Sequence, residues 1–349
     1  MCRRFSAGST HVGYMDTDMT RGVSAPKTRP EEVARQVLEA QKWQQDQKWQ
    51  QEDEESKMSD PFKTASPEEL QWDVFVAPSK PVATDDVPPG VPRRMWSPIT
   101  ATLISGKRHA VLVDPLMTVE ETRALSDWIG ATGKNLMTIY VTHGHGDHSF
   151  GISILRERFP DARAVATPRV LQHMRKQTAP DFLQSFWKSR FPRQLPDEIV
   201  FPDALEGDEF DLEGHDLVVV DLGHTDTDDT TCLYVPSIEL VVAGDAAYND
   251  VHLYLAESGP QGRREWIAAL DKIESLQPRA VVAGHKRAGN DDDPRILEET
   301  RKYIRDFDRV VEETATAREL YDAMRALYPD RVNPGALWSS ARAVKPLRT

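Results

Sequence analysis

Cysteine is almost absent from this chain. Only Cys2 and Cys232 occur among 349 residues, which excludes a disulfide framework and favours a reducing compartment. Long apolar runs are missing too: no stretch of 18 apolar residues occurs, so the sequence predicts no membrane-spanning helix and no membrane partner. The arginines near the start are followed by no apolar stretch, which argues against an export signal. We therefore expect a cytoplasmic protein.

Positive charge is also in short supply. The chain has 43 basic and 56 acidic residues, a formal net charge of −13. Nucleic-acid binding depends on a positive surface field, so the balance argues against nucleic acid as a partner. Hydrophobic residues make up 39% of the chain, enough for the core of one large domain or two ordinary ones.

Residues 1–57 differ in composition from the rest of the chain. They repeat QKWQQ at 41–45 and 47–51 and are rich in Gln, Glu and Lys, with almost no apolar face. This composition predicts a solvated helix or a disordered extension. The two tryptophans of the repeat leave a partner-docking role open. We expect the main domain to span 58–290, with a helical extension over 291–349 packed on it.

Short β-branched runs bounded by Gly, Pro or charge predict strands in both halves of this domain. They lie at 72–79, 99–106, 109–115, 136–143, 162–168, 216–224, 231–236, 239–246 and 279–286. Helical spacing of apolar residues predicts helices at 118–133 and 262–277, and then at 291–313, 315–329 and 334–344. Strand groups interrupted by helices predict an α/β fold of two packed sheets with helices on their outer faces.

Three histidines and an aspartate crowd into HGHGDH, residues 143–148, directly after a predicted strand. Imidazole is the commonest neutral ligand of zinc-like metals, and carboxylate supplies an oxygen ligand. His143 and His145 would point the same way on extended backbone, whereas Gly146 allows a bend before Asp147 and His148. The motif therefore predicts two neighbouring metal sites.

THGHGDH resembles the signature of the metallo-β-lactamase superfamily, whose fold is an αββα sandwich with the metals at one edge of the sheets. Later positions match that family's order of ligands, each after a β-branched run: His224 in LGHT, Asp245 in AGDA and His285 in AGHK. Asp114 in LVDP matches the family's aspartate that steadies the histidine loop. The resemblance covers roughly residues 95–290.

The resemblance implies two divalent metal ions, zinc above all, that generate a bridging hydroxide and polarise a carbonyl. It assigns His143, His145 and His224 to the first metal. It assigns Asp147, His148 and His285 to the second, with Asp245 bridging both.

One motif departs from the family pattern. The family often has GHTPGH, whereas this chain has GHTDTDD. The added carboxylates of Asp226, Asp228 and Asp229 either orient the ligands or form an acidic turn that faces solvent, and the sequence leaves both open.

Tyr248 follows Asp245 by three residues, as in N-acyl homoserine lactone lactonases, which implies a catalytic role for Tyr248 beside Asp147. Phe186, Trp187 and Phe191 lie close together and either line an apolar pocket or form the core face of a helix. We expect a hydrolase of a lactone, ester or related acyl bond whose small-molecule substrate is partly apolar or aromatic, and a homodimer is possible. The alternatives are a hydrolytic dehalogenase of an aromatic chloride and an oxidoreductase like the mononuclear-iron persulfide dioxygenases.

Overall fold

A computed structural model describes residues 69–347 of the chain, so the expected extension over residues 1–57 lies outside the described residues. The described residues belong to one compact unit, Ser66–Thr349. Its first sheet has six strands in sequence order. These are β1 (Gln71–Ala77), β2 (Ile99–Ser105), β3 (His109–Val113), β4 (Asn135–Tyr140), β5 (Arg163–Ala166) and β6 (Asp203–Ala204). Strands β1 to β3 are antiparallel, and β3 to β6 run parallel.

The second sheet has five strands in the order β11-β10-β9-β8-β7. These are β7 (Glu209–Leu212), β8 (His215–Gly223), β9 (Thr230–Val235), β10 (Leu240–Asn249) and β11 (Ala280–Lys286). Neighbours pair antiparallel except β10 and β11, which run parallel because a helix connects them.

The two sheets pack face to face through an apolar core. Val111 and Tyr140 of the first sheet meet Val219, Leu233 and Val282 of the second in one buried cluster. Strands β3, β9 and β10 are buried along most of their length, as expected for strands covered on both faces. This double burial explains why their sequences are nearly continuous apolar runs.

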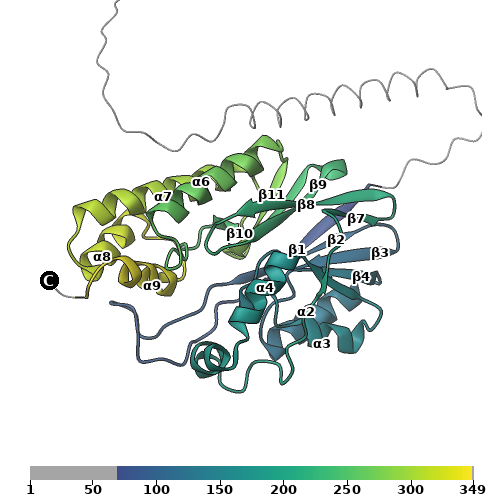
Figure 1. The fold of residues 1–349 in the computed structure, drawn as a ribbon, viewed down its shortest axis with the longest axis horizontal. Helices are drawn as coiled ribbons and strands as arrows, with labels where there is room; N and C mark the ends of the chain where they lie inside the picture. The colour runs from purple at the N-terminus through teal and green to yellow at the C-terminus, as the bar shows by residue number, and fades with distance from the viewer. Residues whose placement is uncertain (1–68, 348–349) are drawn as a thin grey trace, which may run out of the picture. The chain divides into compact units, whose positions relative to one another are not determined.

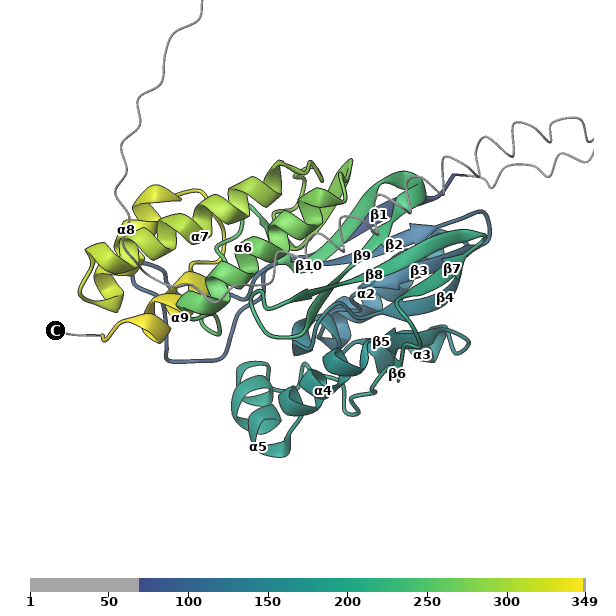
Figure 2. The same ribbon diagram turned by 45° about the horizontal axis from the view of Figure 1, so that its top comes forward.

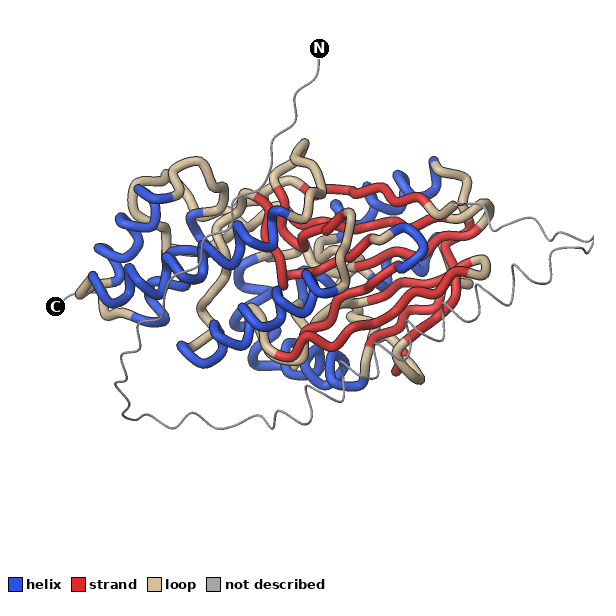
Figure 3. The backbone as a smooth tube through the Cα atoms, turned by 90° about the horizontal axis from the view of Figure 1, so that it is seen from above, coloured by secondary structure: helices blue, strands red, loops and turns tan. Residues whose placement is uncertain are grey.

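Helices cover the two outer faces (Figures 1 and 2). The first sheet carries α2 (Val119–Ala131), α3 (Ile152–Arg158) and α4 (Pro168–Gln177), which share a buried cluster with it. The second sheet carries α6 (Pro260–Ser275) and α7 (Arg295–Glu313), whose apolar faces pack on it together with α8 (Ala317–Leu327) and α9 (Pro334–Val344). Figure 3 shows the strands from above, with helices lying across and beside them.

The predicted αββα sandwich with a helical C-terminal region is therefore confirmed. The sequence analysis did not predict α3 and α4, and it left open whether the segment that follows them is helical. That segment is a short turn, α5 (Pro180–Phe182), continued by the π-helical η2 (Leu183–Lys188). Among residues 69–347, no helix is both long and apolar enough to cross a bilayer.

Candidate metal centre

The HGHGDH loop begins where β4 ends and lies fully within the protein. Residues 143–148 are buried, and the last three form a single 3-10 turn, η1 (Gly146–His148). Asp114, at the end of the neighbouring β3, holds the loop: its carboxylate accepts from the Thr142 N–H at 2.9 Å and from the Thr142 hydroxyl at 2.8 Å. Parallel neighbours end at the same edge of a sheet, which brings this aspartate to the loop.

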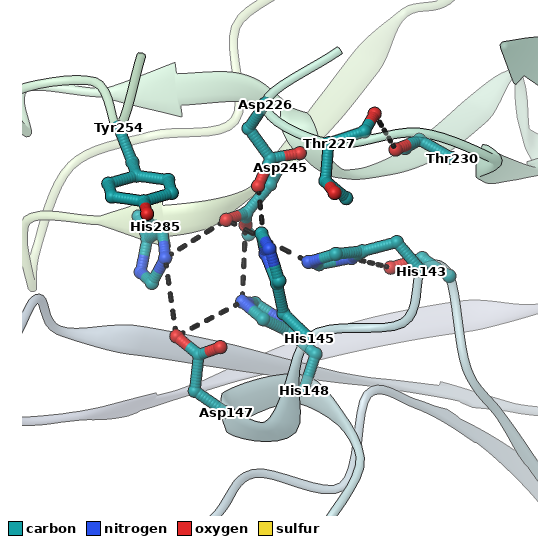
Figure 4. Close-up of polar contacts among 12 residues, drawn as sticks. His143, His145, Asp147, His148, Asp226, Thr227, Thr230, Asp245, Tyr254 and His285 are labelled. Atoms are coloured by element: carbon teal, nitrogen blue, oxygen red, sulfur yellow. Dashed lines mark hydrogen bonds and ion pairs between the residues drawn. The ribbon is translucent and has the colours of Figure 1, made fainter. Parts of the chain in front are cut away.

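Three imidazoles are oriented by a partner at Nδ1. His148 Nδ1 is 3.1 Å from Asp114 Oδ2, His143 Nδ1 is 3.0 Å from the Thr142 hydroxyl, and His285 Nδ1 donates to the Pro98 carbonyl at 2.8 Å. A ring whose Nδ1 is engaged presents Nε2 as the ligand nitrogen. Each Nε2 lies toward the same carboxylate, Asp245 (Figure 4).

Asp245 on β10 stands at the centre of this group. Its Oδ1 is 3.2 Å from His148 Nε2, and its Oδ2 is 3.1 Å from His285 Nε2 and 4.0 Å from His143 Nε2. Gly284 on the adjacent β11 permits this position, because a Cβ there would lie 2.1 Å from Asp245 Oδ1. Asp147 closes the other side, with Oδ2 3.7 Å from His285 Nε2 and 3.8 Å from His148 Nε2.

The structure brings together six of the seven predicted ligands and leaves out His224. The His224 ring lies against Gly262 in the first turn of α6, and its nitrogens are 2.6 Å from Asp228 Oδ1 and 3.0 Å from the Ser258 hydroxyl. Asp226, two residues further, points inward instead. Its Oδ2 is 3.0 Å from His145 Nδ1, and its side chain is fully buried. Gly223, the last residue of β8, has φ 74°, and the backbone bends over residues 225–229, so the two side chains do not follow the alternation of a strand.

The described residues contain four compact donor sets. Two of them hold most of the predicted ligands: His143, His145, Asp226 and Asp245 offer donor atoms within 4.8 Å of one another, and so do Asp147, His148 and His285. The other two are Asp114 with His143 and His148, and His145 with His173 and Glu257. In the part of the chain that the structure describes, the carboxylates of Asp147, Asp226 and Asp245 form ion pairs with histidines alone and with no lysine or arginine.

Buried atoms without hydrogen-bond partners show that these donors fit cations. Four of the twelve such atoms in residues 69–347 lie at the centre of the group: His143 Nε2, His148 Nε2, Asp226 Oδ2 and Asp245 Oδ1. A buried polar atom without a partner costs about 1–3 kcal/mol, and four in one cluster point to an ion that would satisfy them together.

Burial and nearby carboxylates act against each other on the pKa of the histidines. Burial alone would lower the pKa of His145, but the Glu257 and Asp226 carboxylates raise it well above its usual range. Burial opposes protonation of His148 in the same way, and Asp245 and Asp147 raise its pKa. Burial lowers the pKa of His143 well below its usual range, so the carboxylates raise the pKa of only some histidines of the group.

One face of the cluster opens into a pocket that continues to solvent. His145, Asp147, Asp245 and His285 form its floor. Its walls come from segments far apart in sequence: Arg94, Trp96, Phe182, Phe186, Trp187, Arg190, Tyr254, Glu257 and Asn333.

Tyr248 and the aromatic residues Phe186, Trp187 and Phe191 lie in different parts of the site. Tyr248 is fully buried beneath the cluster, where its hydroxyl donates to Asp245 Oδ2 at 3.1 Å, and it does not line the pocket. Phe186 and Trp187 line the pocket, whereas Phe191 is buried in the apolar cluster behind it. The segment therefore lines the pocket through Phe186 and Trp187, and it contributes to the apolar core through Phe191.

Several functional residues escaped the sequence analysis. Trp96 donates through Nε1 to Asp147 Oδ2 at 2.9 Å, and Glu257 lies 3.3 Å from His145 Nε2. Tyr254 lines the pocket beside them. The sequence held one signal for the pair Tyr254 and Glu257, which is their spacing of three residues. This spacing lets two side chains meet on one face of a turn. In the structure the Tyr254 hydroxyl is 3.4 Å from Glu257 Oε1.

The family model of the metallo-beta-lactamase superfamily matches residues 94–285. The chain belongs to the metallo-beta-lactamase superfamily. The matched range runs from the first pocket residue to the last histidine of the cluster, so it includes all the donors described above. Enzymes of this superfamily generally are hydrolases that bind divalent metals and act on small molecules.

Solved structures share the fold at low identity. A metallo-beta-lactamase family protein from Thermus thermophilus is 19% identical, with 77% of this chain and 91% of that chain covered and a TM-score of 0.55. A metallo-beta-lactamase from Pontibacter korlensis is also 19% identical, with 70% and 97% covered and a TM-score of 0.49. A comparison with curated protein sequences gave no match. At such identities the likeness concerns the fold alone.

Proposed function

We propose that this protein is a dinuclear metal hydrolase that opens a lactone or cleaves an ester or related acyl bond. The observation that carries the proposal is the pair of donor sets on either side of Asp245, both at the floor of one pocket. A carboxylate between two sets can bind both ions, which favours two metals over a single iron. Zinc is our first candidate because four of the donors are imidazoles.

When bound, two such cations acidify a water molecule and polarise the carbonyl that it attacks. The chain's own groups position the reactants. Asp147 is fixed by the indole of Trp96, which leaves its Oδ1 free to accept a proton from the attacking water. Asp114 fixes the ring of His148 and, through Thr142, the start of the loop.

The two tyrosines take different roles in this proposal. Tyr248 donates to Asp245 and lies outside the pocket, so it positions the central carboxylate. Tyr254 forms part of the pocket wall, so its phenol is the one that can meet the substrate. An apolar wall next to the metals suits a lactone, an ester or an aromatic compound. Replacement of an aryl chloride would use the same floor.

Metal content and hydrolysis measured together test the proposal. Protein purified without added metal should hold about two divalent ions per chain and should hydrolyse members of a lactone and ester panel. Asp245→Ala should abolish hydrolysis and lower the metal content while circular dichroism and the cooperative unfolding transition remain. One iron per chain with no hydrolysis would contradict the proposal and favour the dioxygenase alternative. Full turnover by the variant would contradict the site.

A further inference from the structure

One wall of the pocket carries a positively charged side chain that forms no ion pair with an acidic side chain of the described residues. Arg94 and Arg190 both line the pocket. Arg94 is engaged: its guanidinium is 2.6 Å from Asp86 Oδ2 and donates to the Gly335 carbonyl at 2.9 Å, which ties the pocket wall to α9. Arg190 forms no ion pair with any residue in the described range 69–347.

Arg190 is held in place while much of its donor capacity stays unused. Its Nη1 donates to the Phe186 carbonyl at 3.1 Å, and its guanidinium lies over the Phe186 ring with Cζ 4.0 Å from the centroid. Stacking on an aromatic face orients the group without neutralising it. Within the described residues, Nη2 and Nε make no hydrogen bond. Both can therefore donate to a planar anion that approaches side-on.

The helical segment places this cation at the end of an aromatic strip. Phe182, Phe186 and Arg190 recur every four residues from α5 through η2 to the second residue after it, and they contact one another in turn. The rings of Phe182 and Phe186 stack at 4.9 Å with an interplanar angle of 10°. Phe182 is 37% exposed.

A second set of contacts connects the strip to the metal floor. Trp96 donates to the ligand Asp147 and meets Phe186 edge-on, with centroids 6.4 Å apart. From floor to mouth the pocket thus presents a carboxylate-rich cluster, an indole, a phenyl ring and a guanidinium. A substrate that fills it would place its scissile bond at the floor, an apolar body against the rings and a group of opposite charge at Arg190.

We propose that Arg190 binds the carboxylate of an amphipathic substrate, so that the preferred substrates are esters, lactones or amides with an apolar or aromatic body and an anionic end. The bond that is cleaved rests on the proposed hydrolase function. The anionic end of the substrate rests on the lining of the pocket alone. The positive surroundings support it: burial and then the charge of Arg94 lower the pKa of Arg190, so the guanidinium gains from a bound anion.

A binding measurement tests the anion site independently of catalysis. Trp96 and Trp187 line the pocket, so their fluorescence reports its occupancy. We expect 4-phenylbutyrate to bind the metal-loaded full chain at least tenfold more tightly than neutral 4-phenylbutyramide. Arg190→Gln should abolish this difference, and Arg190→Lys should restore part of it. Lys188→Gln is the matched control, because Lys188 is exposed in the same segment, lies outside the pocket lining and should leave the preference intact.

A carboxylate that binds the metals instead would give the same preference in wild type and in Arg190→Gln, and that result would overturn the proposal. Equal affinity for acid and amide in wild type would also overturn it. Kinetics provide a second test. In wild type, kcat/KM for the mono-4-nitrophenyl ester of adipic acid should exceed that for 4-nitrophenyl hexanoate about tenfold, because KM is lower. Arg190→Gln should not show this difference. If neither ester is hydrolysed but the binding pattern holds, the acyl-hydrolase function fails and the anion site stands.

Discussion

The identity of one metal ligand gives the sharpest test of this site. The superfamily resemblance assigns His224, whereas the geometry places Asp226 beside His145 and turns His224 toward α6. We predict that Asp226→Asn impairs metal binding and that His224→Asn does not. Asparagine is close enough in shape to Asp226 and to His224 to leave the turn intact. The two positions lie in the same short loop, so each variant serves as the control of the other.

The expected magnitude follows from the spacing of the donors. Members of the first donor set lie within 4.8 Å of one another. Two unit charges about 4 Å apart interact by about 4 kcal/mol at an effective dielectric constant of about 20. A divalent ion within the set is nearer to Asp226 and carries twice the charge, so about 4 kcal/mol is a lower bound. It corresponds to roughly a thousandfold loss of affinity.

Competition with a chromophoric chelator measures this affinity directly, and elemental analysis gives the ions per chain. Asp226→Asn should lose about one ion per chain under conditions where wild type retains two. His224→Asn should stay within a few fold of wild type, because the recorded partners of His224 are Asp228 and Ser258. The opposite pattern, normal binding in Asp226→Asn and loss in His224→Asn, would refute the reasoning and restore the ligand set that the resemblance implies.

Three further predictions test other parts of the argument. Tyr248→Phe removes a hydrogen bond to the central carboxylate and should lower lactone turnover about tenfold at unchanged metal content, since bonds to charged groups are worth about 1.5–3 kcal/mol; equal rates would remove its role. Trp187→Ala empties a site that is 2% exposed and should lower the free energy of unfolding in urea by about 3–5 kcal/mol; a change below about 1 kcal/mol would refute its place in the core. Partial burial alone would raise the pKa of Asp306, but hydrogen bonds from Lys302 and Tyr328 lower it to about 2. Asp306→Asn should therefore destabilise the fold above about pH 4, and its difference from wild type should shrink as the pH falls toward 2; a difference independent of pH would contradict this ion pair.

The sequence predicted the strands and the long helices because their burial leaves a direct pattern. Val111 and Val282 lie between the sheets, so β-branched runs mark their strands. Helices α3 and α4 escaped prediction because they are short and partly exposed. Their positions depend on packing against the first sheet, which the local sequence does not contain.

The histidine loop was predictable because the chain itself fixes its geometry: His143, His145 and His148 share one loop. Asp245 and His285 were predicted through the family resemblance. His224 and Asp226 could not be told apart, because both are good ligands and the backbone bends over residues 225–229. Tyr254 and Arg190 reach the pocket from elements that are distant in sequence, so only the fold shows that they face the same cavity.

The two inferences about charge depend on each other. If Asp226 is a ligand, the carboxylates of Asp147, Asp226 and Asp245 offset three of the four charges of two divalent ions, so the floor attracts an anion only weakly. A three-histidine first site would leave more positive charge there and would compete with Arg190 for the carboxylate of the substrate. The oxygen-rich set also favours harder cations such as Mn²⁺ or Fe²⁺ more than three imidazoles would. An anionic substrate that binds at Arg190 instead of at the metals is therefore what the Asp226 arrangement favours.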